Sequence, residues 1–196
     1  RMRVTKEQFE AMRTRTQATT RQMRVLNVVG IDPGTHTGFA WLSREGVLQV
    51  NEFTFWSAWQ YINDTFFPSN TILVIEQGGL NSPLFSSVAQ RMEAQARAAG
   101  RSITPAMRES FRRAENKHAM NVGAANEQAE LLIAGFRLQG FYVETFRPVA
   151  NKKWKTHEQA VAHTGIKQRT NDHNRVALQA VWDYRHLLKA EHYEYK

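Results

Sequence analysis

Apolar positions recur at short intervals in the first part of the chain and predict β-strands. Three runs rich in apolar and β-branched residues are separated by turn-forming residues at Pro33-Gly34 and at Arg44-Glu45-Gly46. Runs of this length with such separators are typical of consecutive strands joined by tight turns. We therefore expect a three-stranded meander formed by Val25–Ile31, Gly38–Ser43 and Val47–Phe53.

After the meander, helical and strand patterns alternate. An amphipathic aromatic stretch from Trp56 to Phe66, closed by Pro68, predicts a helix, and Thr71–Ile75 predicts a buried central strand. The remaining expected elements are two helices within 80–120 separated near Gly100–Pro105, a helix over Asn121–Gln139, a strand over Phe141–Phe146, and helices through 151–196 with N-caps at Thr156 and at Asn171-Asp172. This order predicts an α/β fold in which a mixed five-stranded β-sheet is flanked by α-helices.

Composition limits the number of domains and the class of partner. A chain of 196 residues that is 42% hydrophobic can form one sizeable core, so we expect one domain with appendages. The 26 basic and 18 acidic residues give a net charge of +8, which favours a polyanionic partner. The absence of cysteine excludes disulfides and thiolate metal ligands and fits a reducing compartment.

Targeting signals are not apparent in the sequence. No apolar run approaches the roughly 18 residues needed to cross a bilayer, and the basic N-terminus is not followed by the apolar segment of a secretory signal. We expect no membrane partner and a cytoplasmic location, in a bacterium or, for a phage-encoded protein, in its host.

Two basic segments lie outside the expected core of the domain. Residues 1–24 carry seven basic and two acidic side chains and form either a solvated helix or a basic arm against DNA or a partner subunit. Residues 80–120 form a basic helical insertion in a domain that spans 25–190. This insertion is either a solvated lid or a surface that enters DNA or forms a dimer, with Phe85 and Phe111 able to stack on unpaired bases.

Acidic residues follow two of the predicted core strands at the point where each strand ends. Asp32 closes the first strand and precedes Pro33-Gly34, and Glu76 closes a later strand and precedes Gln77-Gly78-Gly79. We expect the small residues around Asp32 to leave space in front of it for a cation or a phosphate. Neighbouring carboxylates at such strand ends repel one another unless a cation lies between them.

Oxygen ligands without cysteine favour Mg²⁺ or Mn²⁺. Asp172 and His173, at the start of the last apolar helix, are candidates to complete a metal site with Asp32 and Glu76. Three of these residues also have a simpler structural interpretation, because Asp32 could initiate a turn, Asp172 could cap a helix and His173 could have a structural role. In many enzymes that cleave phosphodiesters, two such ions about 4 Å apart stabilise the attacking water and the leaving oxygen.

Three motifs that carry these residues resemble the RuvC family of Holliday junction resolvases, within the RNase H-like superfamily. The motifs are Gly30-Ile31-Asp32-Pro33-Gly34, Val74-Ile75-Glu76 and Asn171-Asp172-His173-Asn174-Arg175-Val176-Ala177, and Glu144-Thr145-Phe146-Arg147-Pro148 followed by Lys152-Lys153 is also similar. The resemblance implies an RNase H-like fold and a metal-dependent endonuclease. Such an enzyme is usually a homodimer that cuts a four-way DNA junction symmetrically.

One position departs from the family pattern. The last motif of the family usually has the form His-x-x-Asp-Ala, and this chain has Val176 where the acid would stand. Asp32, Glu76 and His173 match the family's metal-binding catalytic positions, and Asp172, one turn earlier, could substitute for the fourth. Without that substitute, the protein would be a weak or inactive nuclease that still binds branched DNA.

Basic residues near the last motif are candidate contacts for backbone phosphates. They are Lys152, Lys153, Lys155, Lys167, Arg169 and Arg175, and the insertion adds Arg112 and Arg113. Trp154, within this group, is expected in the core.

Three alternatives to a junction-cutting enzyme remain. The turn Asp32-x-Gly34-x-x-x-Gly38 also resembles the phosphate loop of actin-like ATPases and sugar kinases, but no second glycine-rich loop is present and we expect no nucleotide cofactor. The other two are a non-cleaving DNA-binding protein and a nuclease for single strands or general branches.

Overall fold

A mixed five-stranded β-sheet forms the centre of the protein in the computed structural model, which describes residues 21–78, 88–147 and 154–195. The strand order is β4-β3-β2-β5-β6. The bounds are Asn27–Asp32 for β2, Thr37–Ser43 for β3, Leu48–Phe53 for β4, Thr71–Glu76 for β5 and Tyr142–Phe146 for β6. β2, β3 and β4 are antiparallel neighbours, whereas β5 runs parallel to both β2 and β6. The predicted α/β class, the meander and the mixed sheet are confirmed.

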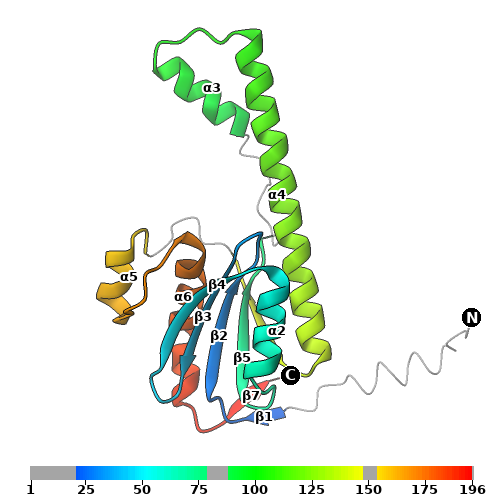
Figure 1. The fold of residues 1–196 in the computed structure, drawn as a ribbon, viewed down its shortest axis with the longest axis vertical. Coiled ribbons are helices and arrows are strands. Elements are labelled where there is room, and N and C mark those ends of the chain that lie inside the picture. The colour runs from blue at the N-terminus through cyan, green and yellow to red at the C-terminus, as the bar shows by residue number, and fades with distance from the viewer. Residues whose placement is uncertain (1–20, 79–87, 148–153, 196) are drawn as a thin grey trace, which may run out of the picture.

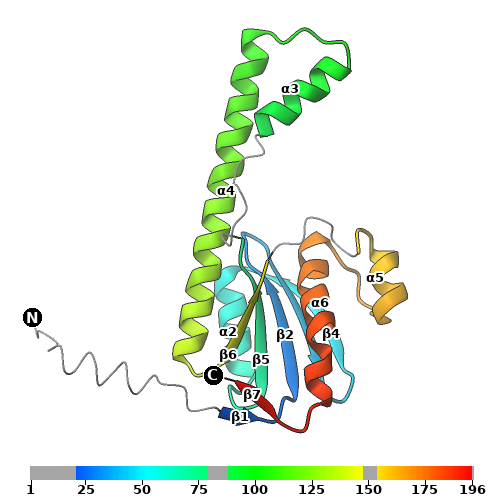
Figure 2. The ribbon, with the colours of Figure 1, turned by 180° about the vertical axis from the view of Figure 1, so that it is seen from behind.

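Helices cover both faces of this sheet (Figures 1 and 2). α2 (Phe55–Thr65) and part of α4 (Pro105–Leu138) pack on one face, and α6 (Asp172–Tyr184) packs on the other. Because strand side chains alternate between faces, Val29 and Ile31 of β2 join the α2 and α4 side while Val28 joins the α6 side. The central strands are therefore buried on both faces, which explains their continuous apolar runs.

α4 is one continuous helix of 34 residues, about 50 Å long. The expected break before Asn121 is wrong because no proline interrupts the helix after Pro105, and Gly123 alone costs only about 1 kcal/mol. The predicted separation near Gly100–Pro105 is confirmed: Gly100 has a φ of +69°, and Thr104 caps the helix. α3 (Val88–Ala98) packs back along the part of α4 that projects beyond the sheet (Figure 1).

The C-terminal third contains more than the predicted helices. α5 (His157–Thr164) begins with a capping box at Thr156, as expected. After α6, the 3₁₀ helix η1 (Arg185–Lys189) leads to β7 (Tyr193–Tyr195), which pairs antiparallel with β1 (Arg21–Met23). The expectation of helices to the C-terminus is wrong for β7, since this short strand exists only through pairing with the other end of the chain. Residues 1–20 of the predicted basic arm lie outside the described residues.

No helix in the described ranges has the length and apolarity required to span a membrane.

Candidate metal site

Three carboxylates lie in one row across the sheet. Gly38 on β3 pairs with both Asp32 on β2 and Glu52 on β4. Ile31 pairs with Ile75, so the following residues of these parallel strands, Asp32 and Glu76, are also neighbours. The row is therefore Glu52, Gly38, Asp32 and Glu76. Residues two positions earlier in each strand, such as Val50 and Val74, face α6, so the alternation directs the carboxylates to the same face.

The start of α6 lies directly over the glycine in this row. A Cβ built on Gly38 would be 2.3 Å from the carbonyl oxygen of His173, and one on Gly30 would be 2.1 Å from that of Ala177. The two glycines therefore admit the backbone of α6. This corrects the expectation that the small residues around Asp32 clear space only for a ligand, although Gly34 meets nothing closer than 3.6 Å.

The N-terminus of α6 is well capped where it meets the carboxylates. Asn171 is the N-cap residue and forms a reciprocal capping box with Asn174, so one of the two predicted capping residues is confirmed and Asp172 is instead the first residue of the helix. The unpaired N–H groups of a helix N-terminus carry a partial positive charge that stabilises nearby carboxylates. The helix start thus offsets part of the repulsion within the row.

His173 and Asp32 are brought together as the sequence predicted. The Nδ1 atom of His173 lies 3.1 Å from Oδ2 of Asp32, and Asp32 is largely buried. This contact holds the imidazole of His173 beside the carboxylate of Asp32, and both groups are of types that bind divalent cations.

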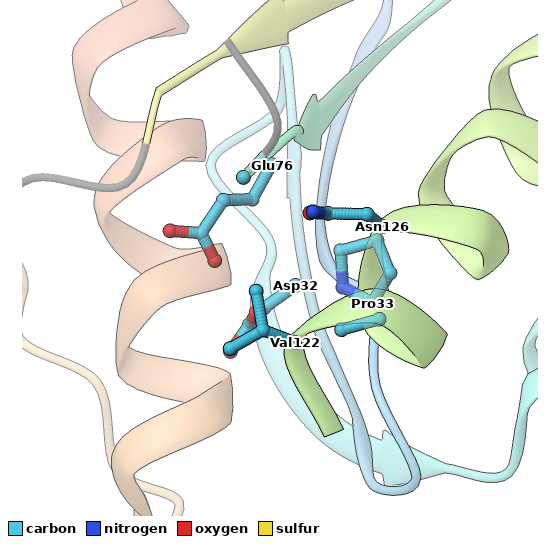
Figure 3. A pocket seen from close by; sticks show the side chains of 7 residues that line it. Asp32, Pro33, Glu76, Val122 and Asn126 are labelled. Atoms are coloured by element: carbon cyan, nitrogen blue, oxygen red, sulfur yellow. The ribbon is translucent and has the colours of Figure 1, made fainter. Parts of the chain in front are cut away.

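Asp32 and Glu76 line one hollow of about 210 Å³ at the end of the sheet. They face it from neighbouring strand ends, and Asn126 faces it from α4 (Figure 3). Asn126 was missed by sequence reasoning. Its only signal was an amide within the apolar face of a helix, beside Val122 and Ala125, which also line the hollow.

Asp172 does not join this arrangement. Its carboxylate pairs with the guanidinium of Arg175, and its side chain is 73% exposed. Among the residues that the structure describes, no three Asp, Glu or His side chains are close enough to hold a metal ion together. By chemistry, the residues at this edge that could hold Mg²⁺ or Mn²⁺ are Asp32, Glu76 and His173.

Arg175 and Val176 are buried in α6. Arg175 is 8% exposed and donates from Nη1 to the carbonyl oxygen of Thr170 over 3.1 Å. The structure therefore argues against the predicted phosphate contact by Arg175, which instead fixes the loop before α6. Val176 is also 8% exposed and is a core residue.

The other predicted DNA contacts differ in their surroundings. Lys155, Lys167 and Arg169 are exposed around α5 and the loop that leads to α6, whereas Lys152 and Lys153 lie outside the described residues. Arg112 and Arg113 are exposed on the projecting part of α4, where both pair with Glu109.

The aromatic residues expected near these contacts are mostly internal. Trp154 is buried, as expected, and Phe111 is also buried, which leaves it little surface for stacking on bases. Phe85 lies outside the described residues.

Two further residues at this edge were missed. His36, in the turn after Asp32, pairs through Nδ1 with Oε1 of Glu52 at 3.0 Å. Glu52 lies on the edge strand β4, where an exposed charged side chain is common and does not suggest a site. Only the pairing register of the strands shows that it belongs to the row of carboxylates.

A scan against protein-family models, a search of curated proteins and a search of solved structures find no significant match to this chain.

Proposed function

We propose that this protein is a metal-dependent endonuclease that hydrolyses phosphodiester bonds in four-way or other branched DNA, as its resemblance to the RuvC family implies. The observation that carries the proposal is the convergence of Asp32, Glu76 and His173 at one edge of the sheet. Asp32 and Glu76 are cross-strand neighbours that line one hollow, and His173 is bonded to Asp32.

The sheet supports an RNase H-like fold for this domain. Its antiparallel meander is followed by two strands parallel to β2, with helices between them, which is the order that the apolar pattern predicts for the five strands of this sheet. Both carboxylates lie at the carboxyl ends of adjacent parallel strands, which is where α/β sheets bind ligands.

The chemistry of the site follows from its donors. Asp32, Glu76 and His173 would hold the cation, and bound Mg²⁺ or Mn²⁺ would neutralise charge on the phosphate. In the hydrolysis, the oxygen of a water forms a bond to phosphorus and the bond to the leaving oxygen breaks, while the water releases a proton to solvent and the leaving oxygen takes one up from solvent. The contact with Asp32 fixes the orientation of the His173 ring.

Basic side chains provide contacts for the DNA backbone on two sides of the site. Lys155, Lys167 and Arg169 are exposed on the segment that leads into α6. The α3–α4 arm, residues 88–120, projects about 30 Å beyond Ala125 at the hollow, because about twenty residues of helix separate Ala125 from Pro105. Contacts to phosphates along this length would hold one duplex of a branched substrate while another enters the site.

A four-way junction has two-fold symmetry, and a homodimer has the matching symmetry. An apolar stripe on α4 is a candidate dimer interface. Met120, Leu131 and Leu138 are 75%, 55% and 89% exposed, and their spacing of 11 and 7 residues places them on one side of the helix. We propose that this stripe pairs with a second copy of the chain. Sedimentation velocity of wild type and Leu131→Glu tests the pairing, and a wild-type monomer at micromolar concentration contradicts it.

A second candidate is a branched-DNA-binding protein that does not cleave. It is favoured by Val176, which is a buried core residue, and by the pairing of Asp172 with Arg175, which leaves the family's fourth acidic position without a replacement. Binding of junctions with no cleavage in either metal would support this candidate.

The decisive experiment compares labelled four-way junction, linear duplex and single strand with Mg²⁺ or Mn²⁺. We expect preferential cutting of the junction by wild type and none by Asp32→Asn. Asp64→Asn, on an exposed position of α2, is the matched control and should cut normally. Equal cutting of all three substrates would contradict junction specificity, and cutting by Asp32→Asn would contradict the site.

A further inference from the structure

His36 lies at the same edge of the sheet as the candidate metal site. It is the last residue of the turn between β2 and β3, and its side chain is 66% exposed. Its ring centre lies 6.3 Å from that of His173, with the ring planes tilted by 30°. Two imidazoles thus stand side by side, one bonded to Asp32 and the other reaching solvent.

Glu52 holds His36 and the start of α6 with its two carboxylate oxygens. Oε1 lies 3.0 Å from Nδ1 of His36, and Oε2 accepts from the side-chain amide of Asn171, the N-cap residue. Since α6 carries His173, one carboxylate fixes the position of both imidazoles. The cross-strand row explains how it does so: Glu52 and Asp32 flank Gly38, and the first turn of the helix lies between them.

We propose that His36 donates a hydrogen bond from Nε2 to a backbone phosphate of the bound DNA, beside the phosphate that is cut, and that Glu52 is its positioning residue. A carboxylate only accepts hydrogen bonds, so the Nδ1–H group of His36 points to Glu52, and an imidazolium has a second donor at Nε2 for an anion. The groups around His36 are Glu52, His173 and, through His173, Asp32. This inference rests on the proposed function, because it needs DNA at the edge where the carboxylates meet.

The test measures affinity for a labelled four-way junction in EDTA at pH 5.5, at which free imidazole side chains are mostly protonated, over a series of salt concentrations. We expect His36→Ala to weaken binding about tenfold and to reduce the slope of log K against log salt by about 0.9, the value for one lost phosphate contact. His36→Arg should restore affinity and slope, since a guanidinium also donates to phosphate. His186→Ala, which removes an exposed histidine beyond the other end of α6, should bind as wild type does.

Glu52 is tested by a pair of variants. Glu52→Ala should weaken binding as His36→Ala does, whereas Glu52→Gln keeps one acceptor oxygen, for either His36 or Asn171, and should restore only part of the affinity. A merely structural role would lower the thermal stability of Glu52→Ala without changing the salt slope of the folded protein. That result would overturn the positioning role.

The outcomes separate this inference from the proposed function. Wild type that cleaves while His36→Ala keeps its affinity and slope overturns the phosphate contact and leaves the nuclease in place. A loss of affinity that His36→Arg does not restore also overturns the contact. Wild type that binds without cleaving, with the slope reduced in His36→Ala, supports the contact and contradicts the nuclease. Wild type that binds no junction overturns both.

Discussion

Gly38 lies beneath the backbone of His173, so closely that a Cβ on Gly38 would be 2.3 Å from the His173 carbonyl oxygen. Gly38 is also the cross-strand partner of Asp32. Because Gly38 has no side chain, the first turn of α6 can lie close to the sheet. The distance between this turn and the sheet decides whether His173 reaches Asp32.

Gly38→Ala tests this relationship. The added methyl group meets backbone atoms that cannot move away alone, so we expect α6 to shift and the protein to lose about 1–3 kcal/mol of unfolding free energy. The shift would also separate His173 from Asp32, and junction cleavage should fall more than junction binding. Urea unfolding and a cleavage assay measure the two effects.

Gly34→Ala is the matched control, because the nearest heavy atom to its Cβ is 3.6 Å away and its φ is not positive. We expect it to unfold at nearly the wild-type urea concentration. If Gly38→Ala were as stable and as active as Gly34→Ala, the close approach of α6 would not matter for the site.

The ends of β2 and β5 could be predicted from the sequence because each of these two strands is a largely apolar run that stops at an acid. That pattern located Asp32 and Glu76, and their adjacency followed once the strands were assigned to one sheet. The capping signals near Asn171 likewise located the start of α6 and hence His173.

The remaining features depend on long-range geometry. Glu52 belongs to the row only through strand register, and Asn126 reaches the hollow through the way α4 packs against the sheet. Arg175 looked like a phosphate contact by its charge, yet the rotation of α6 turns it inward to Thr170. A sequence pattern shows which side of a helix or strand is apolar. It does not show which group a buried polar side chain will contact.

Val176→Asp should make the stability and the nuclease activity of the protein depend on a divalent metal ion. The new carboxylate would be buried one turn after His173 and near other acids, so without metal we expect the melting temperature to fall. With Mn²⁺ at 100 times its dissociation constant, binding should return about 2.7 kcal/mol, and cleavage should rise. Differential scanning calorimetry with and without Mn²⁺ checks the first part and the junction assay the second. No change in either metal affinity or cleavage would mean that position 176 does not face the site.

Arg175 and Lys167 should behave oppositely. Arg175→Ala leaves the carbonyl of Thr170 without its buried donor, so we expect a loss of about 2–4 kcal/mol of unfolding free energy. Lys167→Ala, at an exposed position, should leave stability unchanged and reduce the salt slope of DNA binding by about 0.9. Chemical unfolding and binding titrations separate the two roles. A stable Arg175→Ala protein with weakened DNA binding would restore the phosphate contact that the sequence predicted.

We expect the free energy of unfolding to fall at alkaline pH because of Tyr142. Burial, together with its hydrogen bond to Glu144 of 2.5 Å, raises the pKa of Tyr142 above its usual value near 10. Below pH 10 the hydroxyl is protonated in both the folded and the unfolded chain. Above pH 10 the unfolded chain releases this proton while the folded protein retains it, so stability falls as pH rises. Urea unfolding between pH 8 and 11 should show this fall, and Tyr142→Phe should show a shallower one. Equal slopes would assign the fall to other groups.

The α3–α4 arm yields the last prediction, because the charges of Arg112 and Arg113 are partly offset by one acid. Both guanidinium groups pair with Glu109, at 2.7 and 3.6 Å, and all three side chains are exposed enough for salt to screen them. If the arm holds a duplex, Arg112→Ala with Arg113→Ala should reduce the salt slope of junction binding by up to about 1.8, while Glu109→Gln should tighten binding by releasing both arginines. Contacts to phosphate carry no information on branching, so a loss shared by duplex and junction indicates a backbone clamp, and a loss confined to the junction indicates that the arm reaches the branch. Unchanged binding in both variants would leave the arm outside the DNA interface.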